Sequence, residues 1–224
     1  MQAEPSPQIP RIILRPIASP LPLGFLALAV GTFTIAGVQL SWIPATQSPD
    51  AGLAVLTFVV PLQAVSFIYG FLTRDPAAST GMALQAGGWF SIGLATYTGR
   101  PGQTSAALGL LLVGAATVLL VPAATAALSK VLASLVMALT AVRFYLTGAY
   151  ELTSATGWKD AAGIAGLVLA ALALYAGLAF ELEDSRRATL LPTLRRGPGR
   201  TALAGDLADE VSGVQHEAGI RRTL

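Results

Sequence analysis

One arginine and a small set of amide and hydroxyl side chains are the groups in this sequence that could do chemistry in an apolar setting. Arg143 lies inside the stretch AVRFYLTGAYEL (141–152), which is otherwise suited to a lipid environment. A charge at membrane depth is costly and usually has a partner or a function. Glu151 falls on the same predicted helical face, but eight residues correspond to about 12 Å of rise, too far for an ordinary ion pair within one helix.

Polar stripes at helical spacing recur on four apolar runs. They consist of Thr32 and Gln39 beside Leu28; Gln63, Ser66 and Tyr69; Gln85 and Trp89; and Thr140, Arg143 and Thr147. Such groups either bond helices to one another or line a shared solvated path. A single stripe favours helix contacts, and four stripes in one chain bring the path into consideration. For Arg143 two hypotheses stay open. It is either a structural arginine, snorkelling or bonded between helices, or an anion-attracting group in an outer vestibule, where its planar guanidinium would fit a carboxylate.

The elements that must position these residues are six long apolar runs. The chain has 224 residues, of which 54% are hydrophobic and only 12% charged, against about 25% charged in soluble domains. Each run has about the length that crosses a bilayer core of ~30 Å. The runs are 21–43, 52–72, 82–99, 106–128, 131–150 and 161–182. We therefore predict an all-α membrane protein with six transmembrane helices in one bundle.

The two ends of the chain differ in composition from the bundle. We expect a disordered cytoplasmic N-terminal tail over 1–20, the six-helix domain over 21–184, and a basic cytoplasmic C-terminal tail over 185–224. With both termini inside, eleven lysines and arginines face the cytoplasm and only Arg100 and Lys159 face outward, leaving Arg143 uncounted. The positive-inside rule thus predicts both termini in the cytoplasm. We expect a multi-pass plasma-membrane protein, in the inner membrane if the host has two membranes.

Several kinds of chemistry receive no support from the sequence. The absence of cysteine excludes disulfides and thiolate metal sites. The single histidine, His216, has no second metal ligand near it in the sequence. No HExxH or GxSxG motif and no pair of acidic residues at membrane depth occurs. We expect neither an enzyme nor a cofactor or metal, and the net charge of +2 gives no indication of nucleic-acid binding.

Three stretches of the chain resemble the acetate uptake transporter family, which includes the succinate–acetate permeases. In SPLPLGFLAL (19–28), Pro20, Pro22, Leu23 and Gly24 match the N-terminal motif of the family, and Ser19 replaces its asparagine. Residues 67–90 resemble the end of the second helix, the following loop and the start of the third, although the family's loop glutamate is not kept. Residues 163–192 resemble the sixth helix and its exit.

The resemblance implies six helices around a central path in each subunit, homo-oligomers that are hexameric in known members, and uptake of acetate or other short carboxylates with a proton. It also implies an apolar constriction near Leu28, Trp89 and Leu139. Only about one part in a thousand of an acid with pKa near 4 is neutral at pH 7, and only that form crosses an apolar segment cheaply. Family members usually have an apolar residue at the position of Arg143, so the resemblance implies no role for it.

The predicted function is therefore a permease or channel for short carboxylates. Its partners would be that small substrate, the lipid bilayer and further copies of the chain. The alternative is a membrane protein that transports nothing and that assembles or senses through its basic C-terminal tail. Labelled-acetate uptake separates the two.

Overall fold

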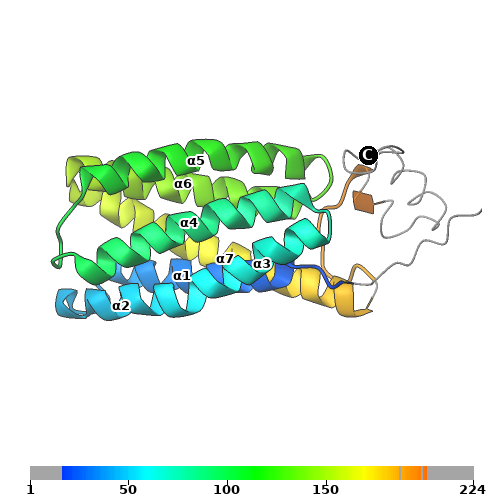
Figure 1. Ribbon diagram of the computed structural model, residues 1–224, viewed down its shortest axis with the longest axis horizontal. Helices are drawn as coiled ribbons and strands as arrows, with labels where there is room; N and C mark the ends of the chain where they lie inside the picture. Colours follow the sequence, from blue (N-terminus) through cyan, green and yellow to red (C-terminus); the bar gives the residue numbers. More distant parts are fainter. Residues whose placement is uncertain (1–16, 187, 198, 201–224) are drawn as a thin grey trace, which may run out of the picture.

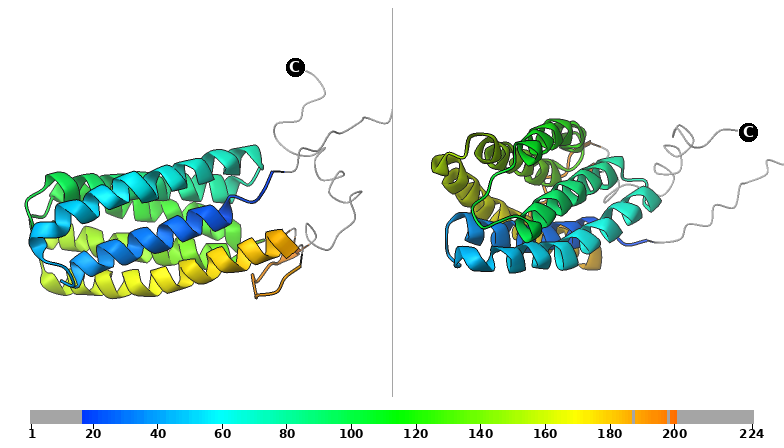
Figure 2. Two further views of the ribbon diagram at one scale, coloured as in Figure 1. Left: turned by 90° about the horizontal axis from the view of Figure 1, so that it is seen from below. Right: turned by 60° about the vertical axis from the view of Figure 1, so that its left-hand side comes forward.

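The computed structural model describes residues 17–186, 188–197 and 199–200, and the predicted tails at 1–16 and 201–224, with His216, lie outside these ranges. Within them the protein is helical, with the long helices aligned along one axis (Figures 1 and 2). The helices are α1 (Leu21–Gln39), α2 (Ser48–Ala54), α3 (Val60–Leu72), α4 (Pro76–Thr98), α5 (Ala106–Ala127), α6 (Val131–Thr153) and α7 (Thr156–Arg186). The 3₁₀ turn η1 (Ala45–Gln47) precedes α2, and the π-helical turn η2 (Val55–Val59) joins α2 to α3 without a break.

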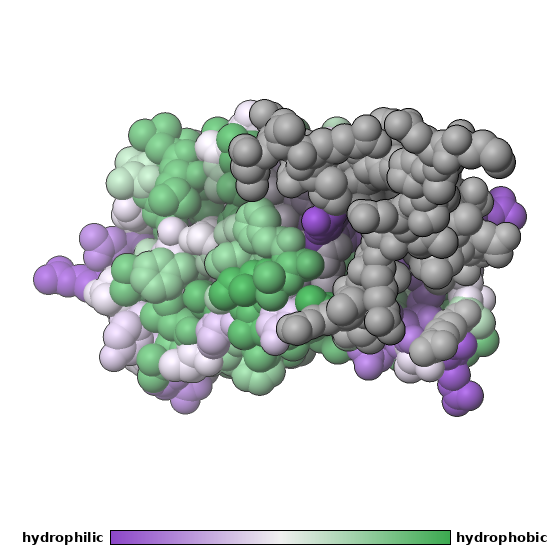
Figure 3. Space-filling view, turned by 45° about the vertical axis from the view of Figure 1, so that its right-hand side comes forward, coloured by the Kyte–Doolittle hydropathy of each residue, from purple (hydrophilic) through white to green (hydrophobic). Residues whose placement is uncertain are grey.

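The outside of the bundle is apolar, which confirms the prediction of an all-α membrane protein. Leucines and valines such as Leu110 and Val121 are about two-thirds exposed, and Figure 3 shows hydrophobic residues over the middle of the molecule. Five described segments are long and apolar enough to cross a membrane, namely α1, Ala45–Leu72, α5, α6 and α7. The remaining long helix, α4, has 23 residues but is less apolar.

Most helices begin earlier or end later than the apolar runs that predicted them. The helix α4 begins at Pro76 rather than at residue 82, because Asp75 accepts a hydrogen bond from the Ala78 amide and Pro76 favours the first turn. Similarly, α7 begins at Thr156 and continues to Arg186. Hydropathy detects only the part of a helix that meets lipid, so polar first and last turns are missed.

Proline alters the second membrane segment in its middle. Pro61 has no amide hydrogen and cannot bond the carbonyl four residues back. The π-helical turn η2 lies directly before it, and the Val60 amide bonds the Val55 carbonyl five residues back. The chain thereby passes the proline without ending the helix, as π-turns commonly allow.

Glycines let several helix backbones come into contact. A Cβ on Gly52 would lie 2.5 Å from the Tyr97 amide nitrogen, so α2 packs directly on α4. Gly109 and Gly148 meet in the same way between α5 and α6, where a Cβ on either would lie 3.0 Å from the carbonyl of the other. Small residues at such contacts are typical of helix packing in membranes.

The N-terminal motif fixes the start of α1 against two other helices. The Ser66 hydroxyl of α3 donates to the Pro20 carbonyl at 2.7 Å. A Cβ on Gly24 would lie 2.5 Å from the Met82 sulfur of α4. Pro22 lies in the first turn, and Leu23 is half-buried. The Ser19 amide donates to Asp184 Oδ2 at 3.2 Å, which places the start of α1 beside the end of α7 (Figure 1).

The chain after α7 returns to the bundle, whereas a tail was expected from residue 185 onward. Residues 188–197, here called the C-terminal strap, cross to the α5–α6 connection, where the Arg196 amide donates to the Ser129 carbonyl at 2.9 Å. Glu183, 3% exposed, accepts from the Thr193 hydroxyl and from Arg195 Nε, each at 2.7 Å. A buried carboxylate paired in this way fixes the strap to α7.

Candidate functional site

A pocket of about 890 Å³ opens at the end of the bundle opposite the strap. It lies where α1, α4 and α6 end and where α5 and α7 begin. Its charged lining residues are Arg100, Lys159 and Glu151, and the Glu151 carboxylate accepts from the Ser105 amide rather than from Arg143. Five of its lining residues are buried, namely Ile35, Gln39, Ser48, Ile92 and Thr147, and of these Gln39 and Thr147 are hydrogen-bonded to each other.

Arg143 lies directly behind this hydrogen-bonded pair. Its Nη2 donates to Gln39 Oε1 at 3.2 Å, and Gln39 Nε2 donates to the Thr147 hydroxyl at 3.3 Å. The Arg143 side chain is 1% exposed, so it does not snorkel to the surface. The guanidinium is held between helices and linked through one amide to the pocket.

Trp89 of α4 supplies an aromatic face for the guanidinium. The Arg143 Cζ lies 4.9 Å from the centre of the indole ring, within cation–π range. Phe144 packs edge-on against the same ring at 5.9 Å between centroids. A Cβ on Gly88 would come within 2.5 Å of the Phe144 ring, so Gly88 makes room for this stack.

A glutamine pair continues the polar groups deeper into the bundle. Gln85 lies one turn before Trp89 on α4, so both face the same side of that helix. Gln63 Nε2 of α3 donates to Gln85 Oε1 at 3.2 Å, and both side chains are fully buried. We call the set Gln39, Thr147, Arg143, Trp89, Gln85 and Gln63 the polar row.

The polar row contains every buried side-chain polar atom that has no hydrogen-bond partner within the described part of the chain. These atoms are Arg143 Nε and Nη1, Trp89 Nε1, Gln85 Nε2 and Gln63 Oε1. Leaving one such atom unpaired costs about 1–3 kcal/mol. Four of the five are donors, so the row is suited to a guest that accepts hydrogen bonds.

The other polar residues predicted for the path divide into two groups. The hydroxyls of Thr32 and Thr140 bond backbone carbonyls, those of Gly166 at 3.1 Å and Val136 at 2.8 Å, and so act as ordinary helix contacts. The same holds for Ser66 at the N-terminal motif. Tyr69 is 46% exposed on the outer surface, apart from the polar row.

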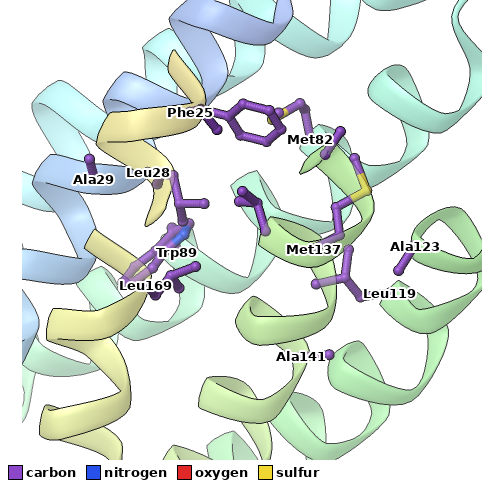
Figure 4. Close-up of a cluster of buried hydrophobic side chains, with 14 of the residues drawn as sticks. Phe25, Leu28, Ala29, Met82, Trp89, Leu119, Ala123, Met137, Ala141 and Leu169 are labelled. Atoms are coloured by element: carbon purple, nitrogen blue, oxygen red, sulfur yellow. The ribbon is translucent and has the colours of Figure 1, made fainter. Parts of the chain in front are cut away.

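Of the three residues named for a constriction, Trp89 belongs to the polar row through its Nε1, and its ring packs with Leu28. Leu28 and Trp89 are fully buried in one hydrophobic cluster together with Leu169 (Figure 4). Leu139 is only partly buried and packs against that cluster. The polar row therefore runs beside an apolar wall.

Two residues near Arg143 were not predicted from the sequence to belong to the site. Phe144 fixes Trp89, and a Cβ on Gly166 would lie 2.9 Å from Arg143 Nε. Nothing in helical periodicity distinguishes either from ordinary packing residues, because both depend on which helices are neighbours.

Residues 1–195 match the sequence pattern of the GPR1/FUN34/yaaH family. The chain belongs to this family. That assignment confirms the resemblance to the acetate uptake transporters, which the N-terminal motif and the sixth-helix stretch had indicated. No match to a curated protein is found.

Among solved structures, this GPR1/FUN34/yaaH family chain is similar to the bacterial acetate channel SatP. The TM-score is 0.69 at 17% sequence identity, over 80% of this chain and 99% of SatP. At that identity the likeness establishes the shared fold.

Proposed function

We infer that the protein carries acetate or another short-chain carboxylate across a membrane. Membership of the GPR1/FUN34/yaaH family and the fold shared with an acetate channel support this inference. The observation that carries it is the polar row, whose donors lie buried behind an open pocket. Buried polar groups at membrane depth typically mark a substrate path.

Transport would be coupled to protons through the substrate itself. No Asp or Glu belongs to the polar row, so it offers no carboxylate relay. The wall formed by Leu28 and Trp89, with Leu139 at its edge, would pass the neutral acid, because burying a bare carboxylate is expensive. Each carboxylate would then cross with one proton.

The proposed topology has six spans with both termini in the cytoplasm of a plasma-membrane protein. Among the described residues, Lys130, Arg195 and Arg196 lie at the strap end, whereas Arg100 and Lys159 lie at the pocket. This asymmetry fits the positive-inside rule with the pocket outside. The apolar outer faces would contact lipid and further copies in a homo-oligomer, a hexamer by resemblance.

Uptake of labelled acetate by proteoliposomes holding the full-length protein tests the function. Formate, propionate, butyrate and succinate should compete according to size if the path selects short acids. We expect uptake well above protein-free liposomes, and faster when the outside is acidic. Correctly assembled protein that takes up none of these acids would contradict the proposal.

A further inference from the structure

Arg143 is fixed on three sides before any ligand arrives. The Trp89 ring lies under the guanidinium, and Gln39 accepts from Nη2. On the third side Gly166 of α7 leaves just enough room, since an added Cβ would lie 2.9 Å from Nε and 3.1 Å from Cζ. A side chain held in this way needs little reordering to bind a partner.

No carboxylate neutralises this guanidinium within the described residues. Asp75 pairs with Lys130 and Glu183 pairs with Arg195, while Glu151 accepts from the Ser105 amide. A buried charge without a counter-charge is strongly unfavourable, so an anion at this position would be stabilising.

The guanidinium also retains the donor geometry that a carboxylate requires. Each of its two fork edges presents two N–H groups, and Nη2 contributes one hydrogen to each edge. Gln39 can occupy only one hydrogen of Nη2, while Nε and Nη1 have no partner. One complete edge is therefore left for two parallel hydrogen bonds, the geometry that distinguishes arginine from lysine.

We propose that Arg143 and Gln39 form a binding site for the anionic form of a small monocarboxylate, entered from the pocket. An incoming carboxylate would take the free edge of Arg143 and accept from Gln39 Nε2 in place of Thr147. The site concentrates the abundant anion. On leaving Arg143 the carboxylate would take a proton from hydronium in the solvent at the pocket, giving the neutral acid and water, and the neutral acid would pass the apolar wall. This inference rests on the proposed function for its substrate class and adds a site that recognises charge.

Acetate and acetamide provide the test, because they share size and shape but differ in charge. Trp89 reports on the site, and the other two tryptophans, Trp42 and Trp158, are about half exposed and outside the polar row. Purified full-length protein carrying W42F and W158F is titrated with each compound at pH 7, and Trp89 fluorescence is followed. We expect acetate to bind at least about tenfold more tightly than acetamide, as a charge-assisted hydrogen bond would give.

Arg143→Gln keeps a donor for Gln39 but removes the charge, and it should abolish this preference. Arg143→Lys should restore part of it. Gly166→Ala keeps the charge but displaces the guanidinium, and its preference should also fall, whereas Gly157→Ala on the same helix meets nothing within 4 Å and should behave as wild type. If Arg143→Gln fails to assemble, this glycine pair carries the test.

Equal binding of acetate and acetamide by the wild type would overturn the site, as would a full preference retained in Arg143→Gln. These outcomes are separate from transport. Protein that takes up acetate without the preference refutes the anion site alone, and protein that prefers acetate but transports nothing refutes the proposed function alone.

Discussion

The strap end of the bundle and the polar row treat charge in opposite ways. At the strap end Glu183 is buried with Arg195 and Thr193 around it, and Lys130 pairs with Asp75 between α4 and the α5–α6 connection. In the polar row Arg143 is buried just as deeply, but its neighbours are uncharged. It contacts the Gln39 amide and the Trp89 ring, and two of its nitrogens have no hydrogen-bond partner. Within the described residues, charges at the strap end are paired where they hold helices together, whereas the buried Arg143 has no carboxylate partner.

This difference indicates which charges serve stability. Removing one partner of a buried pair leaves an uncompensated charge, whereas removing a lone buried charge relieves its desolvation. Substitutions at the strap end should therefore lower stability more than uptake. Substitutions of Arg143 should lower uptake more than stability.

The largest loss of stability is expected for Glu183→Leu. It strands Arg195 and the Thr193 hydroxyl, and breaking a buried pair costs about 3–5 kcal/mol. Because Arg195 is partly exposed, we expect the lower end of that range. Thermal unfolding in detergent should show a clear fall in midpoint, and Glu183→Leu with Arg195→Met should recover part of it. An unchanged midpoint would mean that the strap contributes nothing to stability.

Adjacent glycines on α4 give the next largest effect. Gly88→Ala places a methyl group against the Phe144 ring that packs on Trp89, and overpacking costs about 1–3 kcal/mol. A methyl group at position 87 would have no atom within 4 Å. Gly87→Ala therefore gains the same helix propensity as Gly88→Ala, up to about 1 kcal/mol, without the contact. The difference in unfolding midpoint between the two variants isolates the contact. Equal midpoints would show that the stack at Trp89 is loose.

A smaller effect is expected at the Lys130–Asp75 pair, which is partly exposed. Lys130→Met should cost less than about 1 kcal/mol, the range of exposed pairs. Asp75→Ala should cost about 1 kcal/mol more, because Asp75 also accepts from the Ala78 amide at the start of α4. Unfolding midpoints rank the two variants, and a larger loss for Lys130→Met would contradict the capping role.

The smallest change in stability is expected for Arg143→Leu. Replacing an unpaired buried charge with an apolar side chain should leave the unfolding midpoint unchanged or raise it. Size-exclusion chromatography would confirm assembly. A fall comparable to that of Glu183→Leu would show that Arg143 is a structural residue.

The sequence predicted the helical membrane fold because six long apolar runs have few alternatives. It also placed Gln39, Gln63, Gln85, Trp89 and Arg143 on polar stripes at helical spacing, and all five are buried in the bundle, as expected where polar groups facing lipid are costly. It could not show that Thr32 and Thr140 bond carbonyls while the five atoms of the polar row do not, because partners depend on neighbouring helices.

Two other features lay beyond periodicity. Tyr69 shares a predicted stripe with Gln63 and Ser66, yet it is exposed. Each three-residue step falls about 60° short of a full turn, so Tyr69 lies about 120° around the helix from Gln63, beyond the buried face. The strap was expected to be tail because it lies beyond the last apolar run and carries arginines. Its return to the bundle depends on contacts that periodicity does not show, such as those of Glu183 in α7 with Thr193 and Arg195.

The most direct measurement compares acetate uptake by wild type and Arg143→Leu in proteoliposomes at pH 7 and at pH 5. The neutral acid rises from about a thousandth of the total at pH 7 to about a tenth at pH 5, so anion binding matters most at neutral pH. The charged pocket residues Arg100, Glu151 and Lys159 are the same in both proteins, so their effect on uptake cancels in the ratio of wild-type to variant uptake. We predict uptake about tenfold lower in Arg143→Leu at pH 7, with the defect shrinking toward equality at pH 5. A defect of equal size at both pH values, in correctly assembled protein, would contradict the account.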